Sequence, residues 1–262
     1  MQGNELSPSS TVLSSNTEMN EGQPETKADL LIKGKMSLID HLQEFRIRIV
    51  LSLMAIVIGA SISWFYAGDM IDFLIKPVGK LVFLTPSEAF FSYLKISLFA
   101  GFLLALPVTM HQIWSFLVPA LHKNEKKTIL ILGPASICLF FAGVSFSYYL
   151  VLPAAMNFFM GFTTDQLQPL FSLGAYISFI IAFLLPFGIV FELPLFLIVL
   201  AKMGIINSKY LIIKRKIFIV LAFIIGALAA PTPDVFSQVM VAVPLLLLYE
   251  LSIFVIRYVL KL

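Results

Sequence analysis

Six long runs with at most one charged residue divide this 262-residue chain, and they limit its fold more than any other feature. A helix needs about 20 predominantly apolar residues to cross a bilayer. The runs are apolar on every face, without the alternation of barrel strands, so helices are expected. We predict an all-α polytopic membrane protein with six transmembrane helices, from the runs 49–68, 96–122, 128–164, 166–201, 217–233 and 235–249.

The last two of these runs are short. The stretches 217–230 and 235–249 would rise only about 21 to 23 Å as helices, against a hydrocarbon core of about 30 Å. They are expected to thin the bilayer locally or to be sheltered by neighbouring helices. A single re-entrant hairpin is the alternative. Six prolines predict kinked helices that splay into a concave, cup-shaped bundle, namely Pro107, Pro134, Pro153, Pro186, Pro194 and Pro244.

The composition excludes several classes of protein. Charged residues make up 13% of the chain and hydrophobic residues 59%, whereas a soluble domain carries about 25% charge. A soluble enzyme, a disordered protein and a nucleic-acid binder are therefore poor interpretations. Common catalytic and cofactor motifs are absent, so a membrane protein that is not an enzyme, with no cofactor or metal, is favoured. Cys138 is the sole cysteine and is expected to be a buried thiol.

The charged residues give the domain organisation and the orientation. Residues 1–35 lack aromatic side chains and are predicted to be a disordered cytoplasmic tail, followed by a six-helix transmembrane domain at 36–262. Of the 18 Lys and Arg residues, 15 fall on one side of the six predicted spans, and the other three are Lys76, Lys80 and Lys95. Because basic residues concentrate in cytoplasmic segments, both termini are predicted to be cytoplasmic.

Polar residues near the predicted cytoplasmic side have ordinary explanations. Residues 37–48 form an amphipathic pattern, typical of a helix at the membrane surface before the first span. Within it, Glu44 and Arg48 are spaced as a local helical ion pair. Glu125 is interpreted as a solvated charge in a turn. Trp114 and Phe116 are interpreted as aromatic anchors at the membrane interface.

Glu192 is different, because it interrupts an apolar run. A charged carboxylate near the middle of the membrane costs about 2.5 to 3.5 kcal/mol on insertion scales, so such residues usually face a bundle interior or a wet cavity. The purely structural alternative is a protonated carboxyl bonded to a backbone carbonyl that Pro194 leaves without its helical partner. From the residues alone, a functional and a structural role are equally supported.

Four separated segments together resemble the TatC family, the membrane subunits of the twin-arginine translocase. They occur in the family's order and at matching positions relative to six spans, over about residues 37–262. The segments are HLQEFRIR at 41–48, QIWSF at 112–116 with PAL at 119–121 leading to Glu125, FELP at 191–194 and PTPDVFSQ at 231–238.

The resemblance implies a cup-shaped, six-helix protein of the bacterial cytoplasmic (inner) membrane. It implies binding of the twin-arginine signal peptides of folded precursors and export driven by the proton-motive force. The implied partners are small single-span TatA- and TatB-type subunits, within homo- and hetero-oligomers. The implied site residues are Glu44, Arg46, Phe116 and Glu125 for signal-peptide binding, Glu192 as an intramembrane polar residue, and Asp234 and Gln238 as functional residues on the extracytoplasmic side.

Two other classes remain alternatives. A secondary transporter would use Glu192 as a proton or cation carrier at the midplane, but no internal repeat relates the first three predicted spans to the last three. An intramembrane enzyme is disfavoured because no paired catalytic residues are found. Capture of an Arg-Arg signal peptide, but not of its Lys-Lys version, would distinguish a receptor from a transporter.

Overall fold

A computed structural model of the protein describes residues 27–76, 81–117, 126–164, 166, 169–230, 232 and 234–260. Side chains are described from residue 42 onward in the first helix, and from residue 132 onward in the helix that begins at Lys126. The chain forms two compact units, 1–45 and 46–262. The contacts below belong to the second unit.

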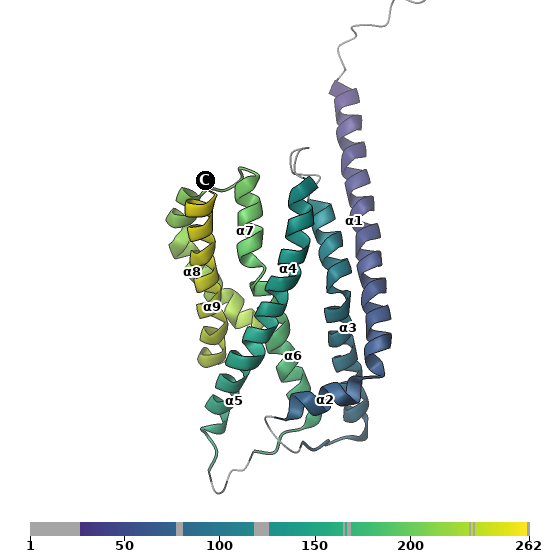
Figure 1. The fold of residues 1–262 in the computed structure, drawn as a ribbon, viewed down its shortest axis with the longest axis vertical. Coiled ribbons are helices and arrows are strands. Elements are labelled where there is room, and N and C mark those ends of the chain that lie inside the picture. The colour runs from purple at the N-terminus through teal and green to yellow at the C-terminus, as the bar shows by residue number, and fades with distance from the viewer. Residues whose placement is uncertain are drawn as a thin grey trace, which may run out of the picture. The chain divides into compact units, whose positions relative to one another are not determined.

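The described residues are mostly helical, with turns and irregular stretches between the helices and a parallel bridge between Val82 and Ser172 (Figure 1). The first helix begins at Lys27, within the stretch predicted as a tail, and residues 1–26 lie outside the described residues. The elements in chain order are α1 (Lys27–Trp64), α2 (Ala67–Ile75), α3 (Pro86–Leu117), α4 (Lys126–Phe146), η2 (Ser147–Val151), α5 (Leu152–Met160), α6 (Leu173–Val190), α7 (Leu193–Lys202), α8 (Ser208–Ala229), α9 (Val235–Phe254) and η3 (Val255–Val259).

Five helical segments among the described residues are long and apolar enough to cross a membrane. This confirms the all-α membrane class. Two of the crossings are composite, because η2 and α5 continue α4, and α7 continues α6 after a turn. The five segments are Leu42–Trp64, Pro86–Phe116, Leu132–Met160, Leu173–Lys202 and Val235–Val259.

The two C-terminal helices differ from the expected pair of short spans. The crossing at Val235–Val259 is 25 residues long, about 37 Å as a helix, so the prediction that it is short was wrong. The uncharged run stops before Glu250, but the helix continues through it. In α8, four basic residues lie in the first half, and the uncharged part, 217–229, rises only about 20 Å.

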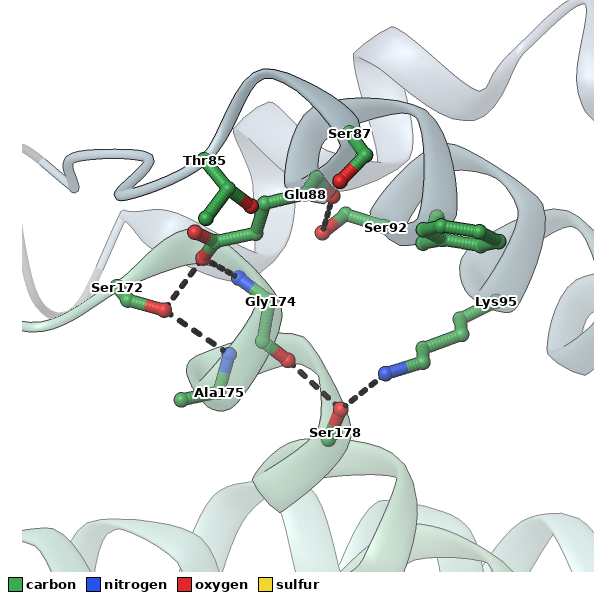
Figure 2. Close-up of a pocket in the computed structure, with 10 residues that line it drawn as sticks. Thr85, Ser87, Glu88, Ser92, Lys95, Ser172, Gly174, Ala175 and Ser178 are labelled. Carbon is green, nitrogen blue, oxygen red and sulfur yellow. Dashed lines mark hydrogen bonds between the residues drawn. The ribbon is translucent and has the colours of Figure 1, made fainter.

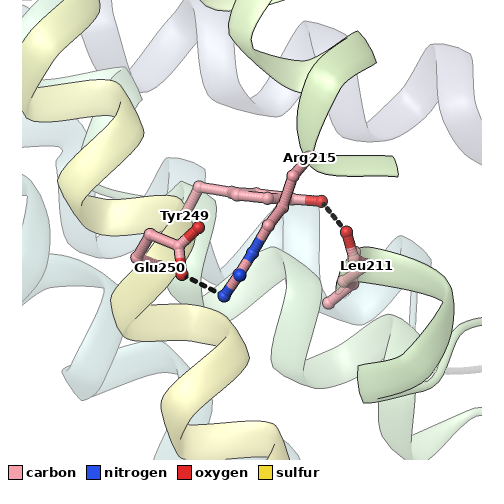
Figure 3. A network of polar contacts seen from close by, with 4 residues as sticks. All are labelled: Leu211, Arg215, Tyr249 and Glu250. Carbon is pink, nitrogen blue, oxygen red and sulfur yellow. Dashed lines mark hydrogen bonds and ion pairs between the residues drawn. The ribbon is translucent and has the colours of Figure 1, made fainter. Parts of the chain in front are cut away.

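Polar contacts between α8 and α9 explain why the last helix continues past Glu250 (Figure 3). The Arg215 guanidinium lies 2.6 Å from a Glu250 carboxylate oxygen, so the acidic charge is paired. The Tyr249 hydroxyl donates to the carbonyl of Leu211 at 2.8 Å. The ring of Tyr249 stacks on Phe218 with 3.8 Å between centroids. The two helices are thus joined by side chains that reach from one to the other.

The core is built around α6, which packs against both α3 and α4. Its inward face includes Ile177, Ile180, Phe183 and Phe187, none of which has measurable exposure. At the start of this helix, the Tyr176 hydroxyl donates to the carbonyl of Leu74 at the end of α2. This central position makes α6 the element that places its neighbours, including both sites described below.

Small residues allow α1 to approach α3 closely. A Cβ added to Gly101 would lie 2.2 Å from the backbone nitrogen of Ala60, and one added to Gly59 would lie 2.6 Å from the Gly101 carbonyl oxygen. Close backbone approach at small residues is a usual basis for helix association in membranes, where lipid is as apolar as the side chains. From residue 46 to the end of α1, the buried residues are Gly59 and Ser63. The close approach at Gly59 and Gly101 therefore provides much of the contact between α1 and α3.

Cys138 is exposed on α4, so the prediction of a buried thiol was wrong. The helix is apolar on every face, and its sequence therefore does not indicate which face packs against protein and which faces lipid.

We predict that Gly101→Val destabilises the protein by about 1 to 3 kcal/mol, because the added methyl groups would overpack the contact with Ala60. Gly133→Val is the matched control, since a Cβ at that position meets no atom within 4 Å among the described residues outside its own helical turn. Thermal unfolding of the purified proteins in detergent measures the difference. Equal unfolding midpoints for the two variants would contradict the importance of the close α1–α3 contact for stability.

Candidate functional site

Glu192 lies in the turn where the composite fourth crossing changes direction. The helix α6 ends at Val190, and α7 begins at Leu193 with Pro194 in its first turn. Since proline lacks an N–H, it is well tolerated at the start of a helix and poorly tolerated inside one. The sequence FELP therefore creates the break in the helix and places a carboxyl group at it.

A chain of side-chain hydrogen bonds reaches Glu192 from two other helices. The indole Nε1 of Trp114 on α3 donates to the Ser136 hydroxyl on α4 at 3.1 Å, and that hydroxyl donates in turn to Oε2 of Glu192. We call these three residues the Glu192 cluster. Trp114 is 4% exposed, so its assignment as an interfacial anchor was wrong. The sequence offered no signal for Ser136.

The second oxygen of the Glu192 carboxyl is chemically available. Its Oε1 is buried and has no hydrogen-bond partner among the described residues. The cluster borders an apolar region, where a buried polar atom without a partner costs free energy. This oxygen could therefore accept a hydrogen bond from an incoming group or bind a proton. That region contains the buried residues Leu106, Met110, Leu132, Phe140, Leu195 and Val199.

These contacts bear on the two interpretations of Glu192. The structural alternative expected a carboxyl bonded to a freed backbone carbonyl, whereas the partner found is a hydroxyl from a different helix. In the described part of the chain, no group of three His, Cys, Asp or Glu side chains could hold a metal ion.

The residues expected to bind a signal peptide are not brought together by the described residues. Glu125 lies outside them, and Glu44 belongs to the first unit. In the second unit, Arg46 is exposed and Phe116 is partly buried near the end of α3. The convergence of Glu44 and Glu125 therefore stays a prediction. Nearby, Arg48 donates to the side-chain oxygen of Gln112 at 3.0 Å and links α1 to α3.

Asp234 and Gln238 have clear local contacts. Asp234 is the N-cap of α9, where its Oδ1 accepts from the backbone N–H of Ser237 at 2.8 Å and its Oδ2 accepts from the Thr232 hydroxyl. Gln238 donates through Nε2 to the carbonyl of Phe223 on α8 at 2.9 Å. Partial burial raises the pKa of Asp234, but hydrogen bonds from Thr232 and Ser237 outweigh it and lower that pKa overall.

Sequence reasoning missed the role of Glu88. Its Oε1 accepts from the Ser172 hydroxyl and from the backbone N–H of Gly174 at 2.6 Å (Figure 2). Its Oε2 accepts from the N–H of Leu84 at 2.7 Å. A carboxylate suits the N-terminus of α6, where backbone N–H groups lack helical partners. The two helices meet across 84 residues of sequence, so no local pattern could indicate this pairing.

Comparison with known proteins identifies one family. A family profile described as "Sec-independent protein translocase protein (TatC)" matches residues 40–244. The TatC protein of Carboxydothermus hydrogenoformans is 42% identical over 228 residues, covering 86% of this chain and 94% of that protein. The TatC protein of Aquifex aeolicus is 44% identical over 227 residues, covering 84% of this chain and 94% of that protein.

Solved structures give the same relationship. A crystal structure of the twin-arginine translocase receptor TatC in the detergent DDM has a TM-score of 0.75 and 43% sequence identity. It covers 82% of this chain and 99% of the solved chain. A second crystal structure of that receptor has a TM-score of 0.74 and 44% identity.

The Asp234 cap leads to a pH-dependent prediction. Removing an N-cap side chain costs about 0.5 to 2 kcal/mol, so Asp234→Ala is expected to lower the unfolding midpoint at pH 7. Because the folded-state pKa of Asp234 is lowered, the stabilisation by its carboxylate is complete above the unfolded-state pKa. It is lost as the pH falls through the folded-state pKa.

The penalty of Asp234→Ala should therefore shrink at acid pH. Asn207→Ala is the matched control, since Asn207 caps α8 by accepting from the N–H of Tyr210 at 2.7 Å and has no acidic proton. Thermal unfolding across a pH series measures both penalties. If the two penalties change in parallel with pH, the hypothesis that protonation of Asp234 weakens its cap of α9 is wrong.

Proposed function

Because the chain belongs to the TatC family of Sec-independent protein translocase proteins, we propose that it is the receptor that binds twin-arginine signal peptides in the membrane. It is a core membrane subunit of that translocase, a transport protein. The observation that carries the receptor role is the likeness, at 43% identity, to a solved chain described as the twin-arginine translocase receptor. In this role it would take folded precursors across the membrane, using the proton-motive force.

The proposed topology has six spans with both termini in the cytoplasm of a bacterial inner membrane. The sixth crossing would be α8, whose apolar part is short but lies along α9 through Gln238, Tyr249 and the Arg215–Glu250 pair. A shared partner helix shelters a short span from hydrocarbon mismatch. The orientation is supported by the placement of 15 of the 18 Lys and Arg residues on the predicted cytoplasmic side and three on the other. The kinked helices support a cup-shaped bundle, assembled with small single-span TatA- and TatB-type subunits.

Two acidic residues are proposed to receive the signal peptide. Glu44 and Glu125 each lie just cytoplasmic of a predicted span, and Arg46 and Phe116 would border the same surface. A guanidinium is planar and pairs with a carboxylate through two hydrogen bonds, which an ammonium cannot do. Two separated carboxylates therefore favour an Arg-Arg pair over Lys-Lys. Each exposed pair contributes about 0.2 to 1 kcal/mol, so docking is weak until the apolar part of the signal also binds.

We expect Glu44→Lys combined with Glu125→Lys to abolish capture of an Arg-Arg signal peptide. A photo-crosslinker beside the signal arginines, added to inverted vesicles that present the cytoplasmic face, measures capture. The control is Asp72→Lys, which reverses an exposed carboxylate on the predicted extracytoplasmic side and should leave capture intact at matched membrane levels. Unchanged crosslinking in the double variant would disprove the acidic surface. Capture by right-side-out vesicles alone would disprove the orientation.

Glu192 is proposed to act during translocation through its unpaired oxygen. The cluster holds one carboxyl oxygen against Ser136 and leaves Oε1 as an acceptor or proton carrier in an apolar region. The far-side residues Asp234 and Gln238 would act at the start of α9, where Asp234 caps the helix and Gln238 joins it to α8.

Glu192→Ala is expected to leave the protein inserted and abundant while export of a folded reporter with a twin-arginine signal falls about tenfold or more. Ser136→Ala should lower export about fivefold, because an acceptor that loses its donor forfeits roughly 1 to 3 kcal/mol. The control is Ser97→Ala, a buried serine that bonds a carbonyl of its own helix. Full export by Glu192→Gln would show that Glu192 acts only through hydrogen bonding. Full export by Glu192→Ala would show that Glu192 has no role in translocation.

A further inference from the structure

A polar pocket and an apolar groove meet at Lys95 and Ser178. The pocket has a volume of about 420 Å³, is open to the surface, and is shown in Figure 2. Its polar walls come from the starts of α3 and α6, and include Thr85, Ser87, Glu88, Ser92 and Ser172. The groove has a volume of about 840 Å³ and runs deeper between the same helices, past Leu98, Phe102, Ala182, Leu185 and Ile189 toward Leu228.

The pocket holds one positive and one negative side chain, Lys95 and Glu88. Among the described residues, the Lys95 ammonium donates one hydrogen bond, to the Ser178 hydroxyl at 2.8 Å. Two of its three protons are thus available to an anion. The Glu88 carboxylate accepts from Ser172, Gly174 and Leu84, and its negative charge in this open pocket can attract a cationic group.

Lys95 lies at the depth where lipid phosphates can be reached. The crossing Pro86–Phe116 is centred near residue 101, so Lys95 lies about 9 Å from the centre along the helix axis. The hydrocarbon boundary lies about 15 Å from the bilayer centre. A lysine side chain on a helix points toward the N-terminus and extends its ammonium to the interface. The ammonium therefore reaches the headgroup layer while its stem lines the groove.

The size of the groove favours a chain-like occupant over a helix. Its 840 Å³ is within the range of about 300 to 1,000 Å³ that holds a small amphiphilic molecule. A membrane-spanning helix is about 10 Å wide and 30 Å long, or roughly 2,400 Å³ as a cylinder. A helix could lie over the groove but could not enter it, whereas an acyl chain could.

We propose that this continuous surface binds one phospholipid with a zwitterionic, amine-bearing headgroup. The lipid phosphate accepts from Lys95, the headgroup ammonium pairs with the Glu88 carboxylate, and one acyl chain lies in the groove between α3 and α6. Both charges of the headgroup are matched by charges on the protein. An anionic lipid without the amine would instead face the Glu88 carboxylate.

Native mass spectrometry of the delipidated full chain in detergent tests this site. The probes are dioleoylphosphatidylethanolamine, dioleoylphosphatidylglycerol and inorganic phosphate. The ethanolamine lipid is expected to form a one-to-one complex and to bind about tenfold more tightly than the glycerol lipid, while inorganic phosphate binds negligibly. Lys95→Gln and Ala182→Phe should each weaken this complex about tenfold, one by removing the cation and the other by filling the groove.

Lys76→Gln is the matched control, because Lys76 is an exposed lysine at the end of α2 that does not line either cavity. Equal binding by Lys95→Gln and Lys76→Gln would overturn the proposal, as would equal binding of the two lipids. If Ala182→Phe leaves lipid binding unchanged but removes a co-purifying single-span subunit, the groove is a helix contact and the lipid site is wrong. Unchanged thermal unfolding of Lys95→Gln shows that a loss of binding is not a loss of fold.

Discussion

The hydrocarbon core offers no hydrogen-bonding solvent, and the arrangement of the helices depends on that constraint. A polar group inside a membrane-spanning helix must find its partner within the protein, and several of these partners lie on a neighbouring helix. The Tyr249 hydroxyl bonds a carbonyl of α8, and the Gln238 amide bonds another carbonyl of that helix. Between another pair of helices, Glu88 on α3 accepts from the start of α6.

The same constraint explains why the two sites lie where they do. Both lie where α6 begins or ends, which is where backbone groups lack helical partners. At its start, Ser172 and Gly174 attract the Glu88 carboxylate and create a polar pocket beside an apolar groove. At its end, Pro194 imposes a break, and the carboxyl of Glu192 is held there by Ser136 of α4.

Several expectations from sequence were confirmed, and the errors have a common cause. Run length and charge predicted membrane-spanning helices, and four short segments predicted the family. The errors concern Trp114, Cys138 and the length of the last crossing, where the outcome depends on a neighbouring helix. Glu250 looked like the end of a span because its partner, Arg215, lies 35 residues earlier in the chain.

The sequence by itself determined that this is a membrane protein, that its spans are helical, and which family it resembles. These conclusions follow from composition, run length and local motifs. Of the candidate site, it identified Glu192 as a carboxyl in an apolar run, but not Ser136 or Trp114. It did not indicate the Lys95–Ser178 contact that joins the pocket and the groove. Only the tertiary structure decided these pairings. A helix that is apolar on every face carries no periodic signal for its packed side, so the partner of each polar side chain is set by which helices pack together.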